Sequence, residues 1–322
     1  MKKISISILS KVRNFFLSSK ITRYLYEQQI NRNIYNKYLL ELALRDKNVK
    51  KYLFDYDTKR EATALAIVQH LGFDSKIFDM PSARVSFFFS RESRQAAVQY
   101  NWSQRLIKEA VDYLKSIGSK YIICRLNPEC IFLKHPLEEA NFRLLDALVK
   151  FNIDLNKYCS SKEDSCVEVR CYKRSDLPYL ERIASEVFIY DRFHSDNFLP
   201  KDKSDYLHKL WIKNICLSNH DDIFVAVKNN KPVGFLSLTE DFILKKVSGL
   251  RVFSITLVAV ALNYQNRGIG RVLICHALDN IKDKADICEV GTQINNIPAC
   301  RTYESLGFKV FSSNLTFRRW MK

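Results

Sequence analysis

The stretch Ser254-Ile-Thr-Leu-Val-Ala-Val-Ala-Leu-Asn-Tyr-Gln-Asn-Arg-Gly-Ile-Gly-Arg271 decides the fold of this chain. Its first half is an apolar, β-branched run that predicts a strand over Ser254–Val260. Gly268 and Gly270 then open a segment, Arg271–Lys282, that predicts a helix. A glycine turn before a helix leaves backbone N–H groups without intrahelical partners, and the helix dipole adds partial positive charge. The stretch therefore predicts a cradle for a phosphate group.

Three glycine-loop patterns compete for this turn. The dinucleotide fingerprint requires G-x-G-x-x-G, but only Gly268-x-Gly270 is present, and the P-loop pattern G-x-x-x-x-G-K-[ST] is missing. The remaining pattern, Gln265-x-x-Gly268-x-Gly270 continued by Arg271, resembles the pyrophosphate loop of the GNAT acyltransferases, which hold coenzyme A. Because neither glycine carries a Cβ, a phosphate can lie directly against the backbone.

A second motif lies downstream, in Asn295–Phe308. Asn296 is a good helix N-cap, Pro298 falls in the first turn, and Gly307 is a natural helix stop. The stretch also resembles the N-x-x-A-x-x-x-Y-x-x-x-G-F signature of the GNAT superfamily. This resemblance implies that Asn296 contacts the cofactor and that Tyr303 protonates the departing thiolate.

Composition narrows the class of protein. A length of 322 residues favours two domains. The net charge is +16, and the first 60 residues hold fourteen Lys and Arg against five Asp and Glu. The milder basic bias of the rest suits anionic ligands such as coenzyme A.

Nine cysteines form no C-x-x-C or Cys/His cluster, which favours reduced thiols in a cytoplasmic protein and predicts no metal site. No apolar run reaches the roughly 18 residues of a membrane span.

The first half of the sequence divides into two regions. Residues 1–55 are typical of basic amphipathic helices, which we expect to pack on the body of the chain or on a second subunit in a homodimer. Contact with an anionic membrane surface is the alternative. Residues 56–160 predict an α/β unit with strands at Ser82–Ser90 and Tyr121–Leu126 and a helix at Leu137–Phe151. No nucleic-acid-binding motif accompanies the basic charge, so we expect no nucleic-acid partner.

Residues 161–322 predict the catalytic unit. The order strand, helix, strand, helix, strand occurs in both halves, and Glu138–Phe142 continued to Phe151–Ile153 stands where Asn296–Phe308 stands later. The first half has no Q-x-x-G-x-G, so we infer a degenerate GNAT-like half without a cofactor site; an unrelated α/β unit is the alternative. The expected fold class is α/β (α+β), a GNAT fold with a mixed central sheet. The degenerate half and a helical N-terminal extension precede it.

Within the GNAT superfamily, residues 70–322 resemble the TDP-fucosamine acetyltransferase group. The segments that carry this resemblance are Phe73–Phe78, Asp191–Asp196, Tyr206–Asn214 and Val290–Asn296. Phe73 replaces a Trp of that group, Asp79 replaces a Gly, and the first 60 residues have no counterpart. The resemblance implies that the acceptor is the amine of a nucleotide-linked amino-deoxy sugar, used in surface-polysaccharide synthesis.

The resemblance also assigns roles to individual residues. We expect the strand backbone to pair with the pantetheine amides of acetyl-CoA, and the N–H of Val258 to stabilise the thioester oxyanion. The strand residues are Leu257, Val258, Ala259 and Val260. The turn that we expect to hold the pyrophosphate comprises Gln265, Asn266, Arg267, Gly268, Ile269, Gly270 and Arg271. The residues that we expect to contact the acceptor are Asp191, Arg192, His194 and Glu240.

Two questions stay open in the sequence. The general base is Glu240, Asp241, His194 or a chain of water molecules. The function has two further interpretations, a GNAT acyltransferase for a peptide, polyamine or antibiotic amine, and a non-catalytic coenzyme A-binding or assembly module. The intact cofactor and signature positions argue against the module. A direct transfer is favoured over a covalent route because no cysteine, Cys300 included, has an evident base partner.

Overall fold

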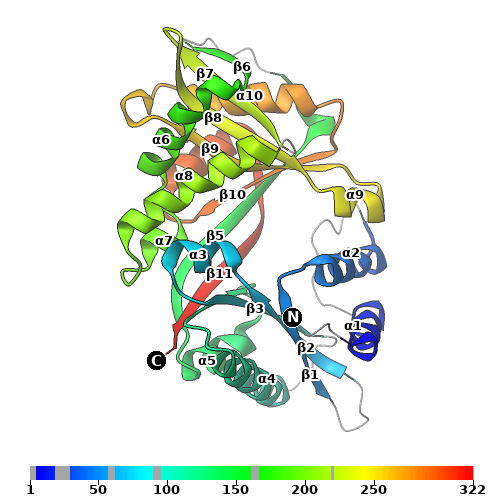
Figure 1. Cartoon of the computed structure of the whole chain (residues 1–322). Coiled ribbons are helices and arrows are strands. Elements are labelled where there is room, and N and C mark those ends of the chain that lie inside the picture. The colour runs from blue at the N-terminus through cyan, green and yellow to red at the C-terminus, as the bar shows by residue number, and fades with distance from the viewer. Residues whose placement is uncertain are drawn as a thin grey trace. The chain divides into compact units, whose positions relative to one another are not determined.

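A computed structural model of the chain describes residues 5–18, 30–56, 62–89, 96–160, 167–218 and 221–321. The chain forms two compact units, and Figure 1 follows it from blue to red. Unit 1 comprises Met1–Ala147, Lys246–Ser248 and Asn314–Lys322, and unit 2 comprises Leu148–Lys245 and Gly249–Ser313. Among the residues that the structure describes, no helix is long and apolar enough to cross a bilayer.

Helices and strands alternate along most of the chain. The α-helices of the described segments are α1 (Ile6–Ser18), α2 (Arg32–Arg45), α3 (Gly72–Phe78), α4 (Ala96–Ser116), α5 (Ile131–Glu139), α6 (Leu177–Val187), α7 (Arg192–Ser195), α8 (Lys201–Ser218), α9 (Phe242–Ser248), α10 (Ile269–Ile281) and α11 (Ile297–Ser305). The strands are β1 (Val49–Tyr56), β2 (Ala62–His70), β3 (Ser82–Phe89), β4 (Tyr121–Leu126), β5 (Arg143–Asp154), β6 (Glu168–Cys171), β7 (Asp222–Lys228), β8 (Lys231–Glu240), β9 (Val252–Val260), β10 (Ile287–Gln293) and β11 (Lys309–Trp320).

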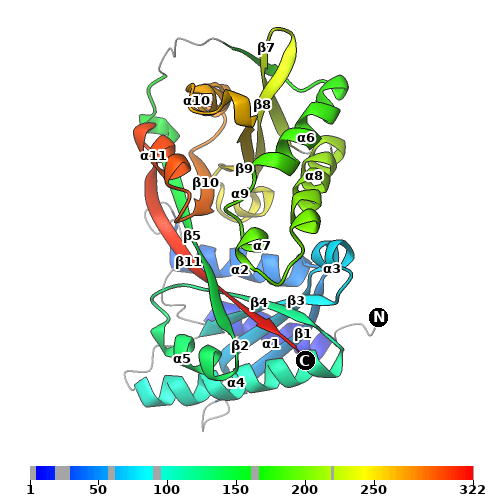
Figure 2. The same ribbon diagram turned by 90° about the vertical axis from the view of Figure 1, so that its left-hand side faces the viewer.

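The sheet of unit 1 has the strand order β1-β2-β3-β4-β11. Strands β3 and β4 are parallel, and the other neighbours are antiparallel. Helix α4 connects β3 to β4, because a parallel pair needs a crossover connection. Helix α4 lies against this sheet (Figure 2). Its apolar residues, among them Leu106, Ile107 and Leu114, are buried there. The predicted strands at Ser82–Ser90 and Tyr121–Leu126 are confirmed as β3 and β4, except that Ser90 lies outside the described residues.

The N-terminal region packs on the opposite face of this sheet. Val12 and Phe16 of α1 are fully buried in one cluster with Tyr52 of β1. The prediction of helix throughout residues 1–55 is wrong at Val49–Tyr56, which forms β1. Alternate side chains of a strand point to opposite faces, and Leu53 accordingly joins the α4 cluster while Tyr52 joins the α1 cluster. Residues 1–4 and 19–29, which the same prediction included, lie outside the described residues.

The sheet of unit 2 has the strand order β5-β10-β9-β8-β7-β6. Strands β9 and β10 are parallel, and the other neighbours are antiparallel. Helix α10 covers one face of the sheet, where Leu273 and Leu278 are fully buried. Helices α6 and α8 lie side by side on the other face (Figure 2). Leu180 and Ile212 of these helices are buried there. Strand β9 is therefore held between two apolar layers.

The two halves of the sequence repeat one pattern, as predicted. The order β3-α4-β4-α5-β5 corresponds to β9-α10-β10-α11-β11. Helix α5 is followed by Asn141 (φ +58°) and the buried Phe142, and α11 is followed by Gly307 (φ +88°) and the buried Phe308. A left-handed residue ends each helix before a strand of 12 residues. The predicted α/β class and internal repeat are thus confirmed.

The last strand of each half completes the sheet of the other unit. Residues Leu148–Asp154 of β5 pair with β10, and residues Leu315–Trp320 of β11 pair with β4. The unit boundary therefore falls within β5 instead of near residue 160. The predicted helix over Leu137–Phe151 is wrong beyond Glu139, because Val149 and Phe151 alternate inward in a strand held by β10.

Candidate active site

The turn between β9 and α10 presents backbone N–H groups at a helix N-terminus. Helix α10 begins at Ile269, and its N-cap is Gly268 in the left-handed conformation (φ +77°). Asn266 is also left-handed (φ +58°). Left-handed residues within a turn direct successive N–H groups into a concave nest that binds anions. The N–H of Val272 donates to the carbonyl oxygen of Gly268 at 3.0 Å, so the N–H groups before it precede the helical ladder.

Side chains hold this turn from its two ends. The Gln265 side chain donates to the carbonyl oxygen of Val260 at 3.0 Å and ties the turn to the end of β9. The Arg271 guanidinium donates to the hydroxyl of Ser305 at 2.9 Å and ties α10 to the end of α11. The exposed Arg267 guanidinium lies 5.5 Å from the centre of the Tyr264 ring. Two cations thus flank a glycine turn of fixed shape, which favours a phosphate ligand.

Strand β9 directs its N–H groups alternately to two edges. The N–H of Leu257 donates to the Ser237 hydroxyl of β8 at 3.2 Å, and the N–H of Ala261 donates to the Val233 carbonyl oxygen at 2.9 Å. Successive N–H groups of a strand point to opposite edges, so the N–H of Val258 points away from β8.

The edge of β9 that the Val258 N–H faces is paired with β10 over only part of its length. The parallel ladder between β9 and β10 joins Val252–Ile255 of β9 to Ile287–Val290 of β10. Strand β8, in contrast, pairs with β9 as far as Val260, across a bulge next to Leu257. The β9 backbone after Ile255 therefore has its ladder partner on the β8 side, and an extended chain such as pantetheine can add to the other side.

Helix α11 begins at the position that the sequence predicted. Asn296 is the N-cap, and its side-chain oxygen accepts a hydrogen bond from the N–H of Ala299 at 3.4 Å. Its side-chain nitrogen donates to the Thr292 hydroxyl at 3.0 Å, which ties the helix start to the end of β10. Pro298 lies in the first turn, as predicted. Asn296 therefore fixes where Tyr303 lies two turns later.

The phenol of Tyr303 is buried in the α10 layer. Its side chain packs between Phe151 of β5 and Phe308, which precedes β11, with ring centres 5.6 and 6.0 Å away. Burial raises the pKa of the phenol above its ordinary value, and the nearby thiol of Cys300 adds to the effect. A phenol with a raised pKa stays protonated at neutral pH, which is the state that a proton donor requires.

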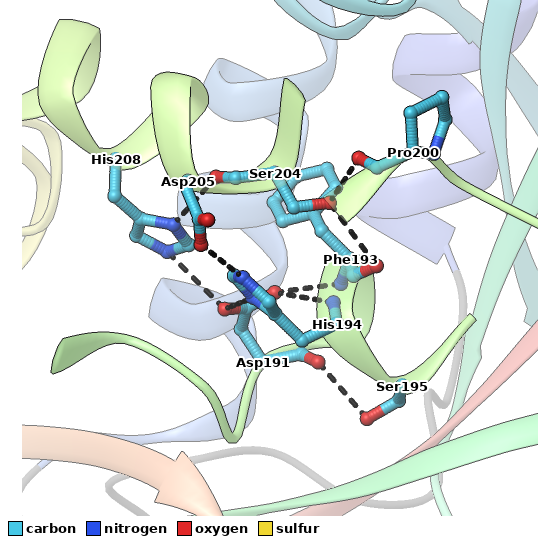
Figure 3. A network of polar contacts seen from close by, with 8 residues as sticks. All are labelled: Asp191, Phe193, His194, Ser195, Pro200, Ser204, Asp205 and His208. Atoms are coloured by element: carbon cyan, nitrogen blue, oxygen red, sulfur yellow. Dashed lines mark hydrogen bonds and ion pairs between the residues drawn. The ribbon is translucent and has the colours of Figure 1, made fainter. Parts of the chain in front are cut away.

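Three of the four predicted acceptor contacts lie in or just before α7. The His194 ring is held between two carboxylates, with Nδ1 2.7 Å from Asp191 Oδ2 and Nε2 2.9 Å from Asp205 Oδ1 (Figure 3). Burial alone would lower the pKa of His194, but the two carboxylates raise it above its ordinary value. Arg192 is buried, and its guanidinium lies 3.9 Å from the centre of the Phe193 ring. These side chains form one compact network within unit 2.

The sequence reasoning missed two members of this network, Asp205 and His208 of α8. The His208 ring is buried, with Nε2 3.4 Å from Asp191 Oδ2 and Nδ1 3.1 Å from the Ser204 carbonyl oxygen. A repeated pattern could have indicated them, because Asp-x-x-His occurs at Asp191–His194 and again at Asp205–His208. Residues three apart on a helical turn face the same side.

The two carboxylates after β8 already have partners. Glu240 is mostly buried, and its Oε1 lies 2.7 Å from Lys245 Nζ. Asp241 is the N-cap of α9 and accepts a hydrogen bond from the N–H of Leu244 at 2.8 Å. Asp241 thus has a local structural role, whereas Glu240 is a buried ion-pair partner. Burial raises the pKa of the Cys300 thiol, which disfavours it as a nucleophile.

Residues 186–308 match the model of the acetyltransferase (GNAT) family. This segment contains the glycine turn, the partly paired edge of β9 and the Tyr303 helix. The segment is thus similar to a GNAT acetyltransferase domain. Members of the family generally use acetyl-CoA. No curated protein matches the chain.

Solved structures show that the GNAT fold extends over the whole chain. A GCN5-related N-acetyltransferase from Sphaerobacter thermophilus is similar with a TM-score of 0.65 and 12% identity, over 96% of this chain and 93% of that chain. A tandem GNAT protein from the clavulanic acid biosynthesis pathway has a TM-score of 0.57 and 9% identity, over 98% and 95%. The glucosamine N-acetyltransferase region of a fungal multi-domain GH3 β-N-acetylglucosaminidase has a TM-score of 0.62 and 16% identity, over 88% and 35%. At these identities the likeness shows the fold alone.

Proposed function

We propose that this protein transfers the acetyl group of acetyl-CoA to the amine of a nucleotide-linked amino-deoxy sugar in the cytoplasm. The observation that carries the proposal is the placement of Val258. Its N–H points to the edge of β9 where the ladder with β10 has ended, and the same strand leads directly into the glycine turn. One continuous backbone can therefore bind pantetheine along Leu257–Val260 and pyrophosphate at Gln265–Arg271.

The chemistry follows from this placement. The acceptor amine attacks the thioester carbonyl carbon, a C–N bond forms, and the carbonyl oxygen becomes an oxyanion that the Val258 N–H stabilises. The C–S bond then breaks, and the phenol of Tyr303 gives its proton to the coenzyme A thiolate. The amine gives up its own proton to water, and Tyr303 is reprotonated from solvent. Each turnover forms one amide and one thiol.

The choice of acceptor has separate support. The sequence resembles the TDP-fucosamine acetyltransferase group in the segments Asp191–Asp196 and Tyr206–Asn214. These segments form α7 and part of α8, the elements that carry the Asp191–His208 network. A solved structure of similar fold is described as a glucosamine N-acetyltransferase region, which is a further amino-sugar enzyme. We therefore assign the α7–α8 region to acceptor recognition.

The test is a coenzyme A release assay with the full chain and acetyl-CoA. The acceptors are TDP- and UDP-linked amino-deoxy sugars, the free amino sugars, a polyamine and a lysine-containing peptide. We expect turnover with a nucleotide-linked sugar and at least tenfold lower kcat/KM with its free sugar. Turnover with the polyamine or peptide alone would move the acceptor to another class, and no acetyl-CoA binding at all would overturn the donor assignment.

A further inference from the structure

The Asp191 carboxylate is the centre of a buried cluster with two imidazoles. Its Oδ1 accepts hydrogen bonds from the N–H groups of Phe193 and His194, at 2.6 and 3.1 Å, and so caps α7. Its Oδ2 lies 2.7 Å from His194 Nδ1 and 3.4 Å from His208 Nε2 (Figure 3). Oδ1 thus accepts hydrogen bonds from the backbone, whereas Oδ2 faces two ring nitrogens that come from different helices.

The outer nitrogen of each ring already has an acceptor. His208 Nδ1 lies 3.1 Å from the carbonyl oxygen of Ser204, and His194 Nε2 lies 2.9 Å from Asp205 Oδ1. An N–H on each outer nitrogen satisfies both acceptors and leaves a lone pair on each inner nitrogen. Both inner lone pairs then converge on the charged Asp191 Oδ2. Three electron-rich atoms at this spacing need a cation among them.

Two kinds of cation can meet that need. A proton on His194 Nδ1 satisfies one of the contacts, whereas a metal ion satisfies all three inner atoms together. The arrangement also has the form of a metal site, because ligating histidines usually donate their other N–H to a carboxylate or a backbone carbonyl. One ligand atom from each of the three residues lies within 4.8 Å of the other two, and the imidazoles are almost fully buried.

We propose that Asp191, His194 and His208 bind one zinc ion that ties α7 to α8. Two imidazole nitrogens and one carboxylate oxygen are ligands that zinc prefers, and a water molecule completes the tetrahedron. Bond lengths of about 2.0–2.1 Å place tetrahedral ligand atoms about 3.3 Å apart. The 3.4 Å between Asp191 Oδ2 and His208 Nε2 fits that spacing, and the 2.7 Å contact to His194 must widen through side-chain rotation.

The ion has a structural purpose that the fold makes clear. Helix α7 has four residues, Arg192–Ser195, and isolated helices of that length are unstable in water. Asp191 and His194 lie at this short helix, and His208 lies in the second turn of α8. Zinc at the three ligands joins the two segments by coordinate bonds, with Asp205 and the Ser204 carbonyl fixing the ring orientations.

The test uses the full chain without a histidine tag, treated with a chelator and then titrated with zinc chloride by calorimetry. We expect one zinc ion per chain with a submicromolar Kd, a higher Tm with zinc, and visible d–d bands of a tetrahedral site when cobalt(II) replaces zinc. His208→Phe keeps a ring stacked on Phe188, 4.8 Å away, but has no ligand nitrogen. We expect it to stay folded by circular dichroism and to lose the stoichiometric binding.

Two further variants distinguish the proposed zinc ligands from other residues. Asp205→Asn removes the outer carboxylate and is expected to weaken zinc binding by about 10–100-fold. His135→Gln, an exposed histidine of α5, is expected to leave binding unchanged. The proposal is overturned if the folded wild type binds no stoichiometric zinc or cobalt, or if His208→Phe binds as the wild type does. It is also overturned if ¹⁵N spectra show both His194 nitrogens protonated at neutral pH in the presence of saturating zinc.

Discussion

The N–H of Leu257 donates to the buried hydroxyl of Ser237, 3.2 Å away, and this contact fixes which edge of β9 the next residue faces. Val258 consequently turns its N–H to the edge where β10 no longer pairs. A side chain of β8 thus determines the direction of a backbone donor in β9. The bulge next to Leu257 makes this possible, because it shifts the register between the two strands.

Replacing Ser237 by Ala should damage both stability and the proposed catalysis. The buried N–H of Leu257 loses its hydroxyl acceptor, which costs about 1–3 kcal/mol of unfolding free energy. We also expect a fall in kcat with little change in the KM for acetyl-CoA, because the oxyanion donor loses its fixed direction. Urea denaturation and steady-state kinetics measure the two effects. Ser185→Ala on the exposed side of α6 is the control, and equal behaviour of the two variants would contradict the prediction.

Tyr303→Phe should separate binding from turnover. The variant keeps the ring that packs against Phe151 and Phe308 but removes the proton that the departing thiolate needs. We expect acetyl-CoA to bind as in the wild type and kcat to fall by about 10²–10⁴-fold. Calorimetry and coenzyme A release measure these quantities, with Tyr179→Phe in α6 as the control. Undiminished turnover would show that another group is the acid.

Alanine substitutions at Gly268 and Gly270 should have different effects on stability. Gly268 is left-handed, and a Cβ there meets no atom within 4 Å, so the cost of Gly268→Ala is conformational, about 1–2 kcal/mol. Gly270 lies within α10, where a Cβ makes an ordinary contact at 3.9 Å with Val260. Gly270→Ala should keep or raise stability, because alanine favours a helix by up to about 1 kcal/mol over glycine. Equal losses in urea denaturation would contradict this contrast.

The ion pair between Arg170 and Asp176 should give a pH-dependent contribution to stability. Burial alone would raise the pKa of Asp176, but the guanidinium at 2.7 and 2.9 Å and the N–H of Lys173 lower it below its ordinary 3.8. A carboxylate with a lowered pKa stabilises the fold above its unfolded pKa and loses that contribution as pH falls through its folded pKa.

Asp176→Asn tests this contribution. We expect it to lower the unfolding free energy by about 1–3 kcal/mol at pH 7, because a bidentate charged pair becomes a weaker neutral contact. The difference from wild type should start to shrink as the pH falls below 3.8, where the carboxylate of the unfolded chain becomes protonated, and should vanish below the lowered pKa of Asp176 in the folded chain. Urea denaturation at pH 7 and pH 3 measures it. A difference that is the same at both pH values would contradict the assignment.

Local signals made two elements of the candidate donor site predictable from sequence. The glycine turn and the Asn296–Gly307 helix each depend on backbone conformations that a few residues determine, and the structure has the expected N-cap and left-handed stop. The hairpin turn at Asn229 and Asn230 is of the same kind, since both residues are left-handed.

Features that depend on distant partners were not predictable. The segment Arg143–Asp154 contains no glycine or proline, so its sequence is compatible with a helix. Its pairing with β10 makes it a strand. Strand β1 was not predictable for the same reason. Its two faces are buried by α1 and α4, which are distant partners in the sequence. The partnership of His194 with His208 joins side chains 14 positions apart on separate helices, and the repeated Asp-x-x-His pattern does not by itself show that the two copies meet.

The exchanged strands β5 and β11 make the two repeats interdependent. A chain severed after residue 160 would give two fragments, each deprived of the strand that completes its own sheet. Neither fragment should fold in isolation, whereas a mixture of both should reassemble. Each half therefore supplies a structural part that the other half needs, so neither repeat can be removed while the other stays folded.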